Sequence, residues 1–297
     1  MSTHVLTAPS TTSSNAAPAP DALRLTFPHI LRSEWIKFRT LRSTVWTLAI
    51  TVVVMVGIAV AFSLLFHANP MSATASSGGA ANLPDARTIA LYGVCGTMAG
   101  IAQLAVAVLG VLVITGEYTT GMIRSTLAAV PRRLPALWAK AVVLAVAVFS
   151  VTAVAVAISW GVMRLVLAGD GLAPDLGNSD TLRCLIGIPL YLTAIALFAF
   201  AVGALLRHSA GALATVFGVL LVLDVVFQIP WAPLQKLSPF TPGNAGIRVL
   251  MPQAMIDAMG KTATSTVLGP WQGYGVLMIW VVVLGAVAAF LLRRRNA

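Results

Sequence analysis

Residues 45–66 read VWTLAITVVVMVGIAVAFSLLF, a run of 22 residues in which no side chain is charged. An α-helix needs about 20 apolar residues to cross the hydrocarbon core of a bilayer, so this run predicts a membrane-spanning helix. The whole composition agrees, because 58% of the 297 residues are hydrophobic and only 9% are charged. A soluble domain carries roughly 25% charged residues. The chain is therefore predicted to be a membrane protein, and a soluble globular enzyme is excluded.

Five further apolar runs have the length of a membrane span. The fourth and fifth of the six runs are separated only by Arg207, His208 and Ser209, which predicts a tight helical hairpin. The expected fold is all-α and polytopic, with a six-helix transmembrane domain over residues 45–292. The five runs cover residues 88–115, 141–163, 185–206, 210–229 and 274–292.

The residues before the first span divide into two segments. Residues 1–24 are rich in Ser, Thr, Ala and Pro, a composition typical of a disordered tail. Residues 25–44 are basic and amphipathic, and they predict an interfacial elbow helix at the membrane surface. A cytoplasmic extension of the first span is the alternative. The expected apolar stripe of this helix consists of Ile30, Leu31, Trp35, Phe38 and Leu41.

The distribution of basic residues predicts how the chain is oriented. Thirteen of the 19 Lys and Arg residues fall in the N-terminal segment, the second and fourth loops and the basic tail at 293–297. Cytoplasmic loops of membrane proteins carry the excess of Lys and Arg, so both termini are expected in the cytoplasm. The same rule accounts for the net charge of +10, and no nucleic-acid partner is expected.

The sequence contains no recognisable catalytic or cofactor motif. Gly260-Lys261-Thr262 ends like a phosphate-binding loop, but Met255 stands where that motif requires a glycine. The two cysteines, Cys95 and Cys184, have no second ligand at a spacing that suits a metal and are interpreted as packing residues. We therefore expect no catalytic residues, no cofactor and no metal.

The second loop carries the most informative pattern. Residues 115–140 read TGEYTTGMIRSTLAAVPRRLPALWAK. Glu117 lies at the end of the second span, where its carboxylate can meet a basic group of a partner or a nearby Arg. Gly121 breaks the helix, Ile123 belongs to the apolar face of a short helix, and Pro131 ends that helix. Such a helix is suited to dock into a cleft on a soluble partner. The usual excess of basic residues in cytoplasmic loops is the alternative explanation. It accounts for the Arg residues of this loop but not for Glu117, Gly121 or the apolar face.

These segments together resemble a known family. The loop is similar to the first cytoplasmic loop of type-2 ATP-binding cassette (ABC) permeases, with their Glu, Pro-Arg-Arg and Lys. LRSEWIKFRTLRSTVWT at residues 31–47 resembles the elbow helix of that family. PFTPGNAGIRVL at residues 239–250 and the chain from residue 268 onward resemble its last external loop, final span and basic tail. The resemblance extends over roughly residues 25–297.

The resemblance implies the permease subunit of an exporter in a bacterial cell membrane. Such a chain binds no ATP itself and pairs with a second permease chain, either identical or a paralogue. It associates with two copies of a separate ABC ATPase subunit. The resemblance assigns ATPase coupling to Glu117, Tyr118, Gly121, Ile123, Arg124, Pro131, Arg132, Arg133 and Lys140. A secondary transporter that needs no ATP and a non-transporting membrane scaffold of an ATPase are the alternatives.

Two polar residues inside the spans are candidates for a transport pathway. Asp224 lies deep in the fifth span, where a charge is costly and often marks a pathway or partner contact. Its position also fits the outer interface, within reach of water or Gln228. Gln103 in the second span is a candidate for a hydrogen bond between helices.

The long loop before the last span is predicted to contain a helix. Asn244 is suited to cap it, and apolar residues follow at intervals of four. They are Ile247, Met251, Met255 and Met259. Pro252, near the first turns, is expected to kink this helix. This apolar stripe is expected to lie on the outer leaflet or to fold back over the exit of the pathway.

Overall fold

The computed structural model describes residues 27–68, 86–121, 133–173, 175–227, 229, 232–262 and 266–294. Six helical segments in these residues are long and apolar enough to cross a membrane. The prediction of an all-α polytopic membrane protein is thereby confirmed. The predicted tail at residues 1–24 lies outside the described residues. The spans are α2 (Arg42–Ala68), α4 (Ala86–Thr119), α6 (Arg133–Leu167), α7 (Ser179–Leu206), the segment that begins with α8 (Ser209–Phe217), and α13 (Pro270–Arg294).

Helix α1 (Phe27–Thr40) precedes the first span and lies against the bundle. The elbow helix was expected to extend to residue 44, but α1 ends at Thr40 and α2 begins at Arg42. The buried side of α1 consists of Ile30, Glu34 and Phe38, at spacings of four residues. Trp35 and Leu41, expected on the apolar face, are 42% and 51% exposed, as residues that face the membrane rather than the bundle would be; their placement on a membrane surface stays a prediction. A carboxylate therefore occupies the middle of the buried stripe.

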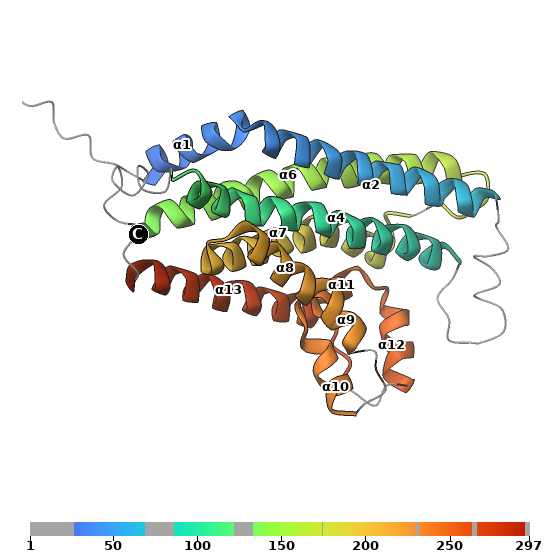
Figure 1. Ribbon diagram of the computed structural model, residues 1–297. Helices are drawn as coiled ribbons and strands as arrows, with labels where there is room; N and C mark the ends of the chain where they lie inside the picture. Colours follow the sequence, from blue (N-terminus) through green and yellow to red (C-terminus); the bar gives the residue numbers. More distant parts are fainter. Residues whose placement is uncertain are drawn as a thin grey trace, which may run out of the picture.

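Helix α7 forms the centre of the bundle and packs against α4, α6 and α13 (Figure 1). In α7, 72% of the apolar membrane-spanning stretch is buried inside the protein, compared with 17% of that stretch in α13. The close approach of α4 to α7 depends on glycines. A Cβ on Gly110 would collide with the carbonyl oxygen of Ala196, and a Cβ on Gly203 would lie 2.7 Å from the side chain of Ile114. Small residues that bring backbones together are typical of membrane helix packing.

The fifth span is a composite helix. It consists of α8, a π-helical turn at Gly218–Val222 and α9 (Leu223–Val226). The tight hairpin predicted before it is present, because Arg207 adopts a left-handed conformation with φ of 56° and His208 caps α8. The π turn was not predicted. It changes the direction in which the residues after it face, including Asp224.

Short helices follow the fifth span and lie beside the start of α13 (Figure 1). They are α10 (Ala232–Leu237), the 3-10 turn Ser238–Phe240, α11 (Pro242–Ile247), the 3-10 turn Arg248–Leu250 and α12 (Gln253–Thr262). The helix predicted to start at Asn244 is not formed as one unit. Thr241 is the N-cap of α11, and Pro252 separates that segment from α12 because proline cannot donate a backbone hydrogen bond.

The two ends of the bundle differ in what they carry (Figure 1). We call the end with α1, the end of α4, the start of α6 and the end of α13 the elbow end. The opposite end, with α10, α11 and α12, is called the far end. The loop that resembles a coupling loop connects α4 to α6 and therefore leaves from the elbow end.

Candidate functional site

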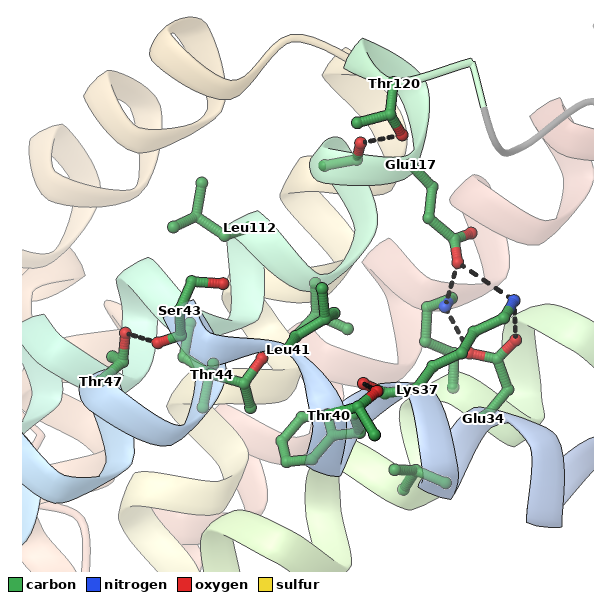
Figure 2. Close-up of a pocket in the computed structure, with 16 residues that line it drawn as sticks. Glu34, Lys37, Thr40, Leu41, Ser43, Thr44, Thr47, Leu112, Glu117 and Thr120 are labelled. Carbon is green, nitrogen blue, oxygen red and sulfur yellow. Dashed lines mark hydrogen bonds and ion pairs between the residues drawn. The ribbon is translucent and has the colours of Figure 1, made fainter.

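The elbow end contains a cavity of about 360 Å³ where α1, the start of α2, the end of α4 and the start of α6 meet (Figure 2). Apolar side chains such as Leu41, Leu109 and Leu112 make up much of its wall, together with several threonine hydroxyls. Four charged side chains also line it, and they belong to three different helices. They are Glu34, Lys37, Glu117 and Lys140.

These four side chains form one ion cluster, which we call the elbow cluster. Lys140 Nζ donates to Glu34 Oε2 at 2.5 Å and to Glu117 Oε1 at 2.8 Å. Lys37 Nζ lies 3.2 Å from Glu34 Oε1 and 3.7 Å from Glu117 Oε1. Figure 2 shows both ammonium groups between the two carboxylates. The cluster contains two positive and two negative groups and is therefore neutral.

Burial makes the elbow cluster energetically important. Glu34, Glu117 and Lys140 are only 4%, 7% and 7% exposed, whereas the Lys37 side chain is 38% exposed. Charges at such depth are tolerated when they are paired, and the removal of one partner leaves another charge buried and uncompensated. Glu117 Oε2 is buried without a partner among the described residues. The cluster therefore holds α1 against the ends of α4 and α6.

The sequence interpretation missed Glu34. The amphipathic pattern was judged from apolar residues, and Glu34 was one acid among several bases. Its position between Ile30 and Phe38 at four-residue spacing is the signal that identifies it as buried. Its main partner, Lys140, follows 106 residues later, so no local pattern shows the pairing.

The structure brings together the two ends of the predicted coupling loop. Glu117 comes just before the loop and Lys140 just after it, and the two are paired directly. Tyr118 stacks under the Arg207 guanidinium at 5.3 Å, and Gly121 has a φ of 71°, as expected of a glycine that ends a helix. Arg133 is the first residue of α6. Four predicted loop residues lie outside the described residues, namely Ile123, Arg124, Pro131 and Arg132.

The two predicted pathway residues lie apart from the elbow cluster. Gln103 is buried and accepts a hydrogen bond of 2.5 Å from the Tyr191 hydroxyl, which links α4 to α7. Asp224 is partly exposed and accepts a hydrogen bond of 3.2 Å from the Thr241 hydroxyl. Gln103 therefore has the interhelical role predicted for it. Asp224 connects the fifth span to the short helices of the far end.

The described residues contain no group of three or more His, Cys, Asp or Glu side chains arranged to hold a metal ion. Cys95 and Cys184 are both buried with free thiols. In this part of the chain the elbow cluster is therefore a set of paired charges rather than a ligand set for a metal.

Comparison with known proteins agrees with the arrangement of the helices. A family model described as ABC-2 family transporter protein matches residues 29–297. The match begins inside α1 and includes the loop between α4 and α6 as well as all six spans. No curated protein matches the chain.

Proposed function

Because the chain belongs to the ABC-2 family of transporter proteins, we propose that it is the permease subunit of an exporter driven by a separate ATPase subunit. The elbow end faces the cytoplasm in this proposal, and both termini lie on that side. The loop between α4 and α6 binds the ATPase. Two permease chains, identical or paralogous, assemble with two ATPase subunits in a bacterial cell membrane.

The elbow cluster is the observation that carries this proposal. Glu117 and Lys140 anchor the two ends of the loop to each other, and Glu34 ties both to α1. A force on the loop therefore acts on α1, α4 and α6 together instead of bending the loop alone. The cluster is neutral and largely buried, so it behaves as a rigid link.

Such a link can transmit work only under a thermodynamic condition. The ATPase must contact the loop differently in its ATP-bound and ATP-free states, because a ligand shifts an equilibrium only by its differential affinity for the two conformations. The loop supplies the basic pair Arg132-Arg133 and the apolar Ile123 for these contacts. The cluster then carries the resulting displacement to α1 and to the spans.

The test begins with a pull-down of the tagged full-length chain from its native membrane in mild detergent, followed by mass spectrometry. We expect an ABC ATPase to be recovered. The double variant Arg132→Glu and Arg133→Glu is expected to insert and fold but to lose the ATPase. The matched control reverses two basic residues outside the loop, Arg164→Glu and Lys236→Glu, and is expected to retain it.

Two results would contradict the proposal. Equal loss of the ATPase in the loop variant and in the control would show that general charge, rather than the loop, determines binding. A clean preparation without any ATPase would favour a transporter that works without ATP, and Asp224 would then be the next residue to test.

A further inference from the structure

Arg248 is a buried cation without a counter-charge among the described residues. It begins the 3-10 turn that follows α11, and only 8% of its surface is exposed. Its Nε and Nη1 atoms are buried and have no hydrogen-bond partner in the part of the chain that the structure describes. Burial lowers the pKa of the guanidinium from its ordinary value, and the neighbouring Tyr92 opposes this effect. An arginine nevertheless remains charged, so the far end holds a charge that no described residue pairs with.

The acidic residues described at the far end all have other partners. Asp180 pairs with Arg183 at 2.9 Å and also accepts the backbone N–H of Gln253. The remaining acids bond to a histidine, a backbone N–H, a threonine and a glutamine. They are Asp170, Asp175, Asp224 and Asp257, respectively. Arg183 is therefore compensated by a described acid, whereas no described acid pairs with Arg248; Asp85, just before α4, lies outside the described residues.

The position of Arg248 places it at the ends of the spans. Its Cβ lies 3.1 Å from the position that a Cβ on Gly273 would take, and its neighbours Val249 and Leu250 press against Gly187 of α7. Gly273 belongs to the first turn of α13, next to Trp271, which is 57% exposed. An exposed tryptophan at the end of a span marks the depth of the lipid headgroups. Arg248 is therefore at headgroup depth.

A buried unpaired guanidinium is too costly to be the complete working state. Unsatisfied buried N–H groups and unpaired buried charges each weaken a fold, and native structures rarely keep them. Arg presents its N–H groups in a planar fork that matches phosphate and carboxylate oxygens. Because no described residue supplies such a group, the candidate partner is an anionic oxygen group that reaches the protein at headgroup depth.

We propose that Arg248 binds the phosphate or carboxylate of an anionic membrane amphiphile at the far ends of α7 and α13. The side chains that cover Nε and Nη1 shift when the anion enters, and the pairing of these groups favours the shift. This site is separate from the elbow cluster and needs no ATPase. Its existence therefore stands or falls independently of the proposed transport function.

The test uses the full-length chain, purified in a neutral detergent and stripped of lipid. Thermal unfolding is followed by tryptophan fluorescence while phosphatidylglycerol, phosphatidylcholine or inorganic phosphate is titrated into the micelles. The wild type is expected to gain a saturable rise in Tm with phosphatidylglycerol and little with phosphatidylcholine. Arg248→Met is expected to begin at an equal or higher Tm, because it removes an unpaired charge.

The variant should then respond to phosphatidylglycerol with at least about a tenfold weaker apparent affinity, which corresponds to about 1.4 kcal/mol. Arg164→Met is the matched control, because Arg164 is an exposed arginine near the end of α6 that stacks on Trp160. It should respond as the wild type does.

Three outcomes would overturn the proposal. If Arg248→Met has a lower Tm than the wild type, by the same amount with and without phosphatidylglycerol, the partner of Arg248 lies inside the chain. Dissociation of a dimer by Arg248→Met without any dependence on lipid would place the counter-charge in a second copy. Equal protection of the wild type by inorganic phosphate would assign the site to a soluble anion instead of an amphiphile.

Discussion

Replacement of Lys140 by methionine should destabilise the protein strongly, because it removes the central cation of the elbow cluster. The substitution preserves the length and the apolar stem of the side chain. It leaves Glu34 and Glu117, which are 4% and 7% exposed, without the ammonium group that contacts both. Lys37 alone then faces the two carboxylates, from 3.2 and 3.7 Å, and its side chain is 38% exposed.

The magnitude follows from burial rather than from the distances alone. At the 2.8 Å that separates Lys140 Nζ from Glu117 Oε1, Coulomb's law with an effective dielectric constant of 20 gives an attraction of about 6 kcal/mol. Much of this is offset by the desolvation of the ions. Removal of one partner from a buried pair has a net cost of about 3–5 kcal/mol. We expect Lys140→Met to fall in this range.

Unfolding in mixed micelles with increasing sodium dodecyl sulfate, followed by circular dichroism, measures this loss. Lys37→Met is the matched control. It removes a cation of the same type from the same cluster, but an exposed ion pair is worth only about 0–1 kcal/mol. The triple variant Glu34→Gln, Glu117→Gln and Lys140→Met should recover most of the stability, because the one charge left in the cluster, Lys37, has a side chain that is 38% exposed and can be solvated.

The reasoning would be refuted if Lys140→Met cost no more than Lys37→Met. It would also be refuted if the triple variant were as unstable as Lys140→Met, since the loss would then come from packing rather than from buried charge. A large loss with recovery in the triple variant would show that the elbow end is held together by one set of charges.

Three further predictions concern the spans. A Gly110→Ala variant should lose about 1–3 kcal/mol of stability in the same unfolding assay, because the added Cβ collides with the backbone of α7. Gly100→Ala is the control. Its added Cβ meets open space, so this variant should be neutral or slightly stabilised. In that assay Tyr191→Phe should cost about 0.6–1.7 kcal/mol, because Gln103 loses its donor, and no cost would indicate that the bond is replaced. Asp224→Leu should insert normally but lose ATP-driven transport in reconstituted vesicles, and normal transport at equal expression would remove Asp224 from the pathway.

The number of spans and their approximate bounds could be predicted from the sequence, because each span must satisfy its backbone internally and face lipid. That requirement leaves a long apolar run whatever the neighbouring helices are. The hairpin at Arg207 was likewise readable, since three residues leave no room for another path. The run at 141–163 lies inside α6, which continues beyond it at both ends, from Arg133 to Leu167.

The features that were missed depend on contacts between distant segments. Glu34 becomes a buried residue only because Lys140 lies opposite to it, and the π turn at Gly218–Val222 has no composition of its own. The predicted capping role of Asn244 failed for a related reason. Local spacing predicted one helix with a kink near Pro252, whereas in the structure Pro252 and the packing against α7 and α13 divide the segment into separate turns and helices.

The two ends of the described bundle treat buried charge differently, and this difference separates their proposed roles. At the elbow end Glu34, Glu117, Lys37 and Lys140 compensate one another, so that end needs no bound ion and can serve as a mechanical link. At the far end Arg248 has no acid available to it among the described residues. The elbow cluster can transmit force between helices, because each of its charged side chains is paired with another. Arg248 has no partner among the described residues for its Nε and Nη1 atoms, so the binding of an added anion would lower its energy.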